Sequence, residues 1–172
     1  GDLKFDFNAY TGAQSVWNKP DALNATQQAE YYNIASDNTG VARETVHDAA
    51  QNPDGQITRT NWIDEIFRTG FMQNYDIGVR GGSEKIIFSS SLGFNKREGT
   101  LLNTQATRIS FRLNSELRIT DKLKIGENVS YTRVNGNSAF TGTQATNGET
   151  NYNGIIAQAI KAPPHVPVFD SD

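Results

Sequence analysis

The segment from Arg108 to Thr120, RISFRLNSELRIT, alternates between apolar and polar residues. Because side chains in a β-strand point alternately to opposite faces, a strand is the structure that separates two such sets. Three arginines and a glutamate on one face are too much charge for a packed core, so that face must meet water. The apolar set comprises Ile109, Phe111, Leu113, Leu117 and Ile119, and the polar set comprises Arg108, Ser110, Arg112, Asn114, Glu116 and Arg118.

The same alternation occurs in four other segments, so the chain is predicted to be all-β. Between Lys122 and Thr132, Glu127 is the one polar residue among the apolar positions. The predicted strands cover residues 3–10, 72–81, 85–95, 107–119 and 122–134.

The connections between these strands alternate in length. Gly81-Gly82-Ser83-Glu84 and Thr120-Asp121-Lys122 are tight turns that predict antiparallel hairpins, whereas residues 11–70, 96–106 and 135–172 form long loops. Tight turns at one end and long loops at the other are typical of an up-and-down transmembrane β-barrel, whose strands are apolar outward and polar inward. A soluble antiparallel β-sandwich binding module with one wet face predicts the same alternation, so the pattern alone leaves both architectures open.

Composition excludes several classes of protein. The hydrophobic fraction is 36%, mean hydropathy is −0.57, and no run approaches eighteen apolar residues, so no transmembrane helix is predicted. A net charge of −3 argues against a general nucleic-acid binder. The absence of cysteine rules out disulfides and thiolate metal sites within the chain.

Short helices are predicted inside the long loops. Asn24 is a candidate N-cap for a helix that runs to Ala35, with Gln27 or Gln28 closing a capping box. Its expected contact face comprises Leu23, Ala29, Tyr32 and Ala35. A second helix is predicted to begin at Thr60 or Asn61, to dock through Trp62, Ile63, Ile66 and Phe67, and to end at Gly70. Residues 154–161 form a third candidate helix, and the prolines from Pro163 onward require extended chain.

No catalytic, cofactor or metal site is predicted from these residues. Asp64 and Glu65 are adjacent, so on a helix they diverge by about 100° and form a poor acid/base pair. His47 and His165 lie far apart in the sequence without ligand spacing around either. A glycoside hydrolase would need two converging carboxylates, and no spacing in the chain supports such a pair. The arginines at 108, 112 and 118 are expected to pair with Glu116 and neighbouring acids, or to line a lumen.

Several ordered motifs resemble one family. Residues 62–75, WIDEIFRTGFMQNY, are similar to the W-x-D-E-I-F-R-T-G-x-x-Q-N-Y segment of SusC/RagA-type TonB-dependent transporters, and residues 79–85, VRGGSEK, to the hairpin V-x-G-G-x-E-K. Residues 91–99, SLGFNKREG, resemble S-L-G-Y-x-x-x-E-G, and residues 162–169, APPHVPVF, resemble a P-P-x-x-P-V loop. Residues 21–30, DALNATQQAE, resemble D-x-L-N-A-x-x-Y-A-E, with Gln28 where an aromatic is usual.

The resemblance implies an outer-membrane transporter and not an enzyme. Residues 1–172 are expected to be the N-terminal part of the barrel, just after the plug, within a partial barrel segment whose long loops are extracellular. The implied function is import of glycan or peptide fragments with a SusD-like surface lipoprotein, driven by the TonB complex through an N-terminal region that this sequence does not contain. A siderophore or vitamin receptor is the alternative within the same architecture.

This architecture assigns a medium to each face of the sheet. The lipid-facing residues are expected to be Phe88, Leu92, Ile109, Phe111 and Leu113, in contact with outer-membrane lipid. The residues facing the lumen or plug are expected to be Arg108, Arg112, Glu116 and Arg118. Loop aromatics, including Trp17, Tyr31, Tyr32 and Trp62, are expected to pack within the loops or against the lipoprotein.

Overall fold

The computed structural model describes residues 2–139, 144–146, 149–151 and 154–169. The chain forms two compact units: residues 1–15 with 69–138, and residues 16–68 with 139–172. None of the described helices is long and apolar enough to cross a membrane.

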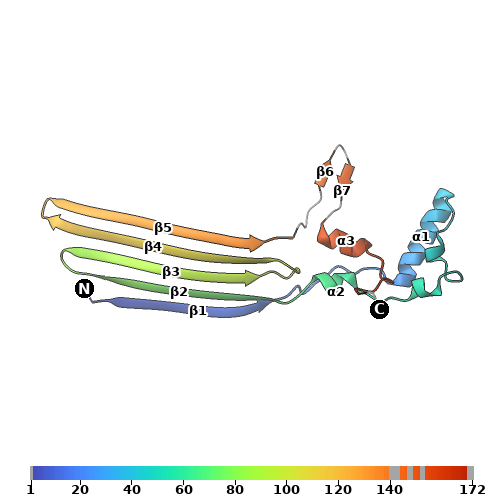
Figure 1. The fold of residues 1–172 in the computed structure, drawn as a ribbon, viewed down its shortest axis with the longest axis horizontal. Helices are drawn as coiled ribbons and strands as arrows, with labels where there is room; N and C mark the ends of the chain where they lie inside the picture. The colour runs from blue at the N-terminus through green and yellow to red at the C-terminus, as the bar shows by residue number, and fades with distance from the viewer. Residues whose placement is uncertain (1, 140–143, 147–148, 152–153, 170–172) are drawn as a thin grey trace. The chain divides into compact units, whose positions relative to one another are not determined.

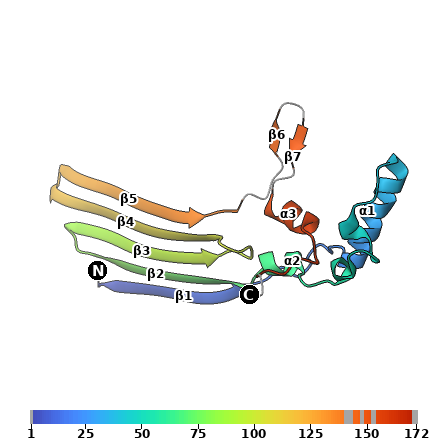
Figure 2. The same ribbon diagram turned by 45° about the vertical axis from the view of Figure 1, so that its right-hand side comes forward.

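The first unit is a single antiparallel sheet of five strands in the order β1-β2-β3-β4-β5 (Figure 1). The bounds are β1 (Lys4–Gln14), β2 (Gly70–Gly82), β3 (Ile86–Glu98), β4 (Gln105–Thr120) and β5 (Leu123–Asn137). Each strand pairs with its neighbour in sequence, so the up-and-down topology expected from the turns is present. The β2–β3 and β4–β5 turns lie at the end of the sheet where β1 begins, and the β3–β4 connection lies at the opposite end (Figure 2).

The strands are longer than the predicted ones, mainly at the end away from the tight turns. β1 continues to Gln14 instead of ending near residue 10, β3 continues to Glu98, and β5 continues to Asn137. These added residues, TGAQ, KRE and NGN, show no alternation of apolar and polar side chains. They extend the strands because the neighbouring backbone completes the hydrogen-bond ladder, as where Gln14 pairs with Gly70.

Register aligns the apolar positions of all five strands into rows. One row runs from Phe7 through Ile77, Leu92 and Phe111 to Tyr131. These side chains remain exposed in the described residues, with Phe7 at 72% and Ile77 at 50%. A β-sandwich buries such rows between two sheets, so the exposed apolar face is unlike a sandwich interior.

The second unit contains the helices α1 (Ala25–Thr39), α2 (Trp62–Ile66) and α3 (Ile155–Lys161), the 3₁₀ turns η1 (Thr45–His47) and η2 (Pro53–Gln56), and a small hairpin of β6 (Gln144–Thr146) and β7 (Glu149–Asn151). The predicted capping box of α1 is confirmed: Asn24 accepts from the backbone N–H of Gln27, whose side chain accepts from the backbone N–H of Asn24. α3 also lies where it was predicted.

Two predictions about these helices are wrong. Of the predicted contact face of α1, Ala29 is buried, together with Ala25 and Gln28, whereas Leu23, Tyr32 and Ala35 are exposed. Small side chains let the first turn of the helix approach the neighbouring loop, where the backbone N–H of Ala25 donates to the Thr58 hydroxyl at 2.9 Å.

The second error concerns the end of α2. The helix ends at Ile66 because Phe67 already has extended backbone angles, and Gly70 instead opens β2. Asn61 is confirmed as the N-cap, since its side-chain oxygen accepts from the backbone N–H groups of Ile63 and Asp64.

Candidate functional site: the two faces of the sheet

One face of the sheet concentrates positive charge. Strand alternation and register place seven basic and three acidic side chains on it, although the whole chain has a net charge of −3. The basic residues are Lys4, Arg80, Arg97, Arg108, Arg112, Arg118 and Lys124, and the acidic residues are Asp6, Asp76 and Glu116. This polar face therefore favours anionic groups.

Two acidic residues of the polar face pair with cations across strands. Glu116 lies 3.2 Å from the Lys124 ammonium, and Asp6 lies 3.6 Å from the Arg80 guanidinium. The expected pairing of Glu116 with Arg108, Arg112 or Arg118 is therefore replaced by a pair with the diagonal neighbour on β5. In the part of the chain that the structure describes, those three arginines have no ion pair.

A shallow depression lies beside Arg112. Register sets Arg112 opposite Ser91 on β3 and Ser130 on β5, so short side chains flank its long one. The depression has a volume of about 260 Å³ and is lined by Asp6, Gly78, Val79, Arg80, Ser89, Ser90, Ser91, Arg112 and Asn114. Arg80 is paired with Asp6 at this depression, so among the described residues Arg112 is the guanidinium there that has no ion pair and can interact with an anionic group.

A polar network crosses β2 and β3 on the same face. The Asn95 amide donates to the Asn74 side-chain oxygen at 3.1 Å, and the Asn74 amide donates to the Asp76 carboxylate. Asn74 is 8% exposed, although it lies on a face that is otherwise wet. Sequence alternation placed these residues on the polar face but did not single them out, because the Asn74–Asn95 pairing depends on register.

The five residues predicted to face lipid share the opposite face. Phe111 lies opposite Leu92 and Tyr131, Ile109 opposite Phe94, and Leu113 opposite Val129; Phe88 belongs to the next row. On β4 the apolar set from Ile109 to Ile119 spans about 33 Å of strand. A strand tilt of about 40° would reduce this to about 25 Å, the height of the apolar band of outer-membrane barrels.

In the second unit the proline segment, residues 163–167, is hydrogen-bonded to the start of α2 and to residues just before it. The Pro164 carbonyl accepts from the backbone N–H groups of Arg59 and Thr60 at 2.8 and 3.0 Å, and the Thr60 hydroxyl donates to the Val166 carbonyl at 2.7 Å. The Trp62 indole donates to the Pro163 carbonyl at 2.9 Å. Two loop motifs about a hundred residues apart thus form one structure, which agrees with the expectation that Trp62 packs within the loops.

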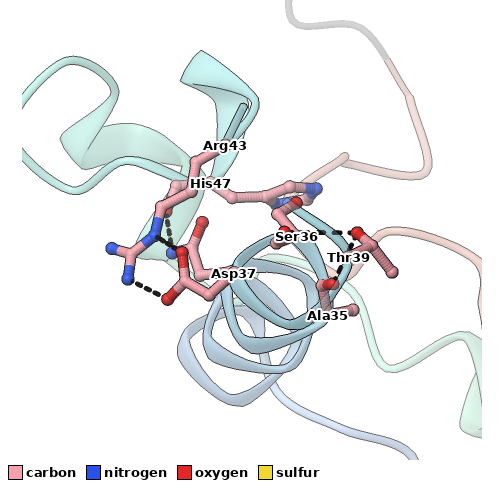
Figure 3. Close-up of polar contacts among 7 residues, drawn as sticks. Ala35, Ser36, Asp37, Thr39, Arg43 and His47 are labelled. Carbon is pink, nitrogen blue, oxygen red and sulfur yellow. Dashed lines mark hydrogen bonds and ion pairs between the residues drawn. The ribbon is translucent and has the colours of Figure 1, made fainter. Parts of the chain in front are cut away.

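The end of α1 is held by a charged contact (Figure 3). The Arg43 guanidinium donates to both carboxylate oxygens of Asp37, at 2.9 and 2.5 Å, and the Thr39 hydroxyl donates to the Ala35 carbonyl at 2.9 Å. The hydrogen bond from Arg43 lowers the pKa of Asp37 below its usual value. In the next turn, hydrogen bonds from the Ala50 backbone and the Gln51 side chain lower the pKa of Asp48.

We expect acidification to loosen this loop. Because the pKa of Asp37 is lower in the folded chain, its pairing adds stability above the ordinary aspartate pKa, and this contribution is lost as the pH falls through the lowered value. Hydrogen exchange of residues 37–51 should therefore be less protected at about pH 3 than at about pH 6, after correction for the intrinsic pH dependence of exchange. In Asp37→Asn the change should be smaller, and an equal change in both proteins would contradict the assignment.

The described residues contain no cluster of three or more His, Asp or Glu side chains that could hold a metal ion. The carboxylate of Asp64 accepts hydrogen bonds from the Lys19 ammonium and the Asn61 amide, both at 2.6 Å. These contacts stabilise the first turn of α2. His47 stacks on Tyr32 with ring centroids 4.7 Å apart. The backbone carbonyl of His165 accepts from Arg59. The side chains of Asp64 and His47 therefore make local structural contacts.

An antiparallel sheet with one charged face, one exposed apolar face and tight turns at one end is the kind of sheet from which transmembrane β-barrels are built. No protein-family model matches the chain. Among curated proteins, TonB-dependent receptor P26 of Formosa agariphila is 27% identical over 96% of this chain and 15% of its own length. TonB-dependent receptor P3 of the same organism is 28% identical over 97% of this chain and 15% of its own length. TonB-dependent receptor SusC of Bacteroides thetaiotaomicron is 25% identical over 66% of this chain and 10% of its own length.

Solved structures of related fold also match this chain. A structure of the RagAB peptide transporter matches 80% of this chain and 18% of the solved chain, with a TM-score of 0.62 at 23% identity. The RagAB peptide importer in an open-open state matches 84% of this chain and 19% of the solved chain, with a TM-score of 0.62 at 20% identity.

The chain is homologous to TonB-dependent receptors of the SusC/RagA type, and its sheet matches part of the barrel of such a receptor. TonB-dependent receptors are transporters of the outer membrane and not enzymes. The chain spans about 15% of the length of the first two curated relatives that it matches.

Proposed function

We propose that this chain is part of an outer-membrane TonB-dependent transporter. It forms the first strands of the barrel, just after the plug. The main supporting observation is the sheet itself, whose five paired strands each separate a mainly apolar face from a mainly polar one, with one shift of register between Arg118 and Thr120 on β4. In lipid every backbone polar group needs a partner, so β1 and β5, the edge strands of the described sheet, pair with further strands of a closed barrel.

On this proposal the two faces meet different media. Phe88, Leu92, Ile109, Phe111 and Leu113 contact the hydrocarbon of the bilayer, and Tyr75, Phe94 and Tyr131 lie toward its interface. Arg108, Arg112, Glu116 and Arg118 face the interior. The long loops, which were predicted at residues 11–70, 96–106 and 135–172, lie outside the cell.

The transported solute is a nutrient fragment, a peptide or a glycan. Solved structures that match the fold include those of a peptide importer, which supports peptides. The basic polar face favours solutes or protein surfaces with carboxylates. A SusD-like surface lipoprotein is the proposed partner of the extracellular loops, where Trp17 and Tyr31 are 95% and 61% exposed. Coupling to the TonB complex is assigned to an N-terminal region beyond these residues.

Cysteine labelling tests this orientation, because the chain contains no native cysteine. A polarity-insensitive fluorophore would be attached to Phe111→Cys and, as the matched neighbour on the opposite face, to Arg112→Cys. Both variants would be made in the full-length receptor without other accessible cysteines and reconstituted in vesicles that contain brominated lipids. We expect strong quenching at position 111 and weak quenching at position 112.

Equal quenching at both positions would contradict the assignment of faces. The receptor should be released from membranes by detergent only, with the lipoprotein in the same preparation. Release without detergent would contradict the membrane location.

A further inference from the structure

Glu127 lies on the apolar face of the sheet. On β5 it occupies the same face as Ile125 and Val129, and across the strands it is opposite Ser115 on β4. The Ser115 hydroxyl donates to one carboxylate oxygen of Glu127 at 3.1 Å. Among the described residues this is the only partner recorded for the Glu127 side chain.

The position of Glu127 is near the middle of the apolar band. Leu123 and Tyr131, four residues to either side on the same face, are each about 13 Å away along the strand. With a strand tilt of about 40°, each lies about 10 Å away along the membrane normal, close to half of a band about 25 Å tall. A carboxylate at this depth is costly unless it has a partner, and one hydroxyl does not satisfy it.

The described sheet offers no cation for this carboxylate. Arg133 shares its face but lies six residues along β5, about 20 Å away. Lys124 belongs to the opposite face and is paired with Glu116. On the β4 side the cross-strand position is taken by Ser115, so the remaining approach is from the other edge of β5.

That edge of β5 is open in the described sheet. β5 is hydrogen-bonded to β4 alone, and all fifteen of its residues are exposed. A strand that completes the ladder there would put one side chain directly opposite Glu127, with Cβ atoms about 4.5–5.5 Å apart. Charge complementarity at that depth selects a lysine or an arginine.

We propose that Glu127 forms an intramembrane ion pair with a lysine or arginine on the strand that pairs with the free edge of β5. This inference rests on the proposed function, because it requires the apolar face to meet lipid. The pair fixes the register of that junction, since a shift of one residue would move the cation to the other face and leave Glu127 alone in hydrocarbon.

The test uses urea unfolding of the full-length receptor reconstituted in vesicles. If the pair exists, Glu127→Leu removes one partner and leaves a cation on the lipid face. The ratio of folded to unfolded receptor should then fall by more than about tenfold. Replacing the in-register basic residue with leucine in the same molecule should restore much of the loss. Val129→Leu, on the same face and strand, is the control and should change the ratio little.

A gain in stability for Glu127→Leu, or no change, would overturn the inference, because an unpartnered carboxylate is improved by an apolar substitute. If the leucine variants fail to insert, disulfide formation between Glu127→Cys and a cysteine at the in-register residue gives a second answer. A disulfide there with a non-basic native residue would also overturn it. Such results leave the proposed function intact if position 111 is still quenched by brominated lipid, whereas loss of that quenching would remove the proposed function itself.

Discussion

Phe111→Arg is expected to destabilise the membrane-inserted receptor by about 1–3 kcal/mol, because Phe111 lies between the bilayer midplane, where an arginine on the lipid face costs about 2–4 kcal/mol, and the interface, where it costs about 0–1 kcal/mol. Phe111 belongs to the row of aromatic and aliphatic side chains that includes Leu92 and Tyr131. The substitution removes its aromatic surface from hydrocarbon and places a guanidinium there. Long side chains reduce this penalty by extending toward the interface, which is why the range is wide.

Arg112→Ala is the matched control for this experiment, since it changes the adjacent residue on the opposite face. Arg112 has no ion pair in the described residues, so its loss should cost less than about 1 kcal/mol. Both variants would be unfolded with urea in vesicles and compared by their midpoints at a common slope. Two equally mild effects would show that the face of Phe111 does not meet lipid.

The alternation of β4 was sufficient to predict the strand, its two faces and its charge. The arginines at 108, 112 and 118 and the apolar set that includes Phe111 lie on opposite faces, as predicted. A side-chain period of two is a local property, so it needs no knowledge of the neighbouring strands. For that reason the sheet was the most predictable part of the chain.

Non-local contacts explain what the sequence did not predict. The residues from Thr11 to Gln14 have no apolar period, and their strand conformation comes from pairing with residues 70–73 on β2. Glu116 on β4 pairs with Lys124 because the register places Lys124 diagonally opposite it on β5. The Asn74–Asn95 hydrogen bond likewise required the pairing of two strands.

The helices show a second limit. The helical period indicated Leu23 and Tyr32 as contacts for α1, because large apolar residues are the usual choice for a buried face. The chain buries the predicted Ala29 together with Ala25, and these small residues let the helix approach the loop around Thr58 closely. The size of the space beside a helix cannot be read from the helix alone, so this face was mispredicted.

Ile63→Ala is expected to destabilise the loop unit by about 2–5 kcal/mol. Ile63 is 2% exposed and is the largest fully buried side chain of the described residues. It lies in α2 between the Asn61 cap and Ile66. The neighbouring residues Thr60 and Trp62 donate hydrogen bonds to the proline segment. Removing its branched side chain loses the transfer free energy of the buried groups and leaves a cavity. The loss should therefore reach the proline segment as well as α2.

Hydrogen exchange of the full-length receptor measures this effect locally. Protection of amides in α2 and of residues 163–166 should fall by about 30-fold or more, the equivalent of about 2 kcal/mol, while the strands β2 to β4 keep theirs. Ile57→Ala is the control, because Ile57 belongs to the same unit and is 50% exposed. If both substitutions lowered protection equally, the buried position of Ile63 would not be what stabilises the unit. If protection fell in the sheet to the same extent as in α2, the two units would unfold together and the loop unit would have no stability of its own.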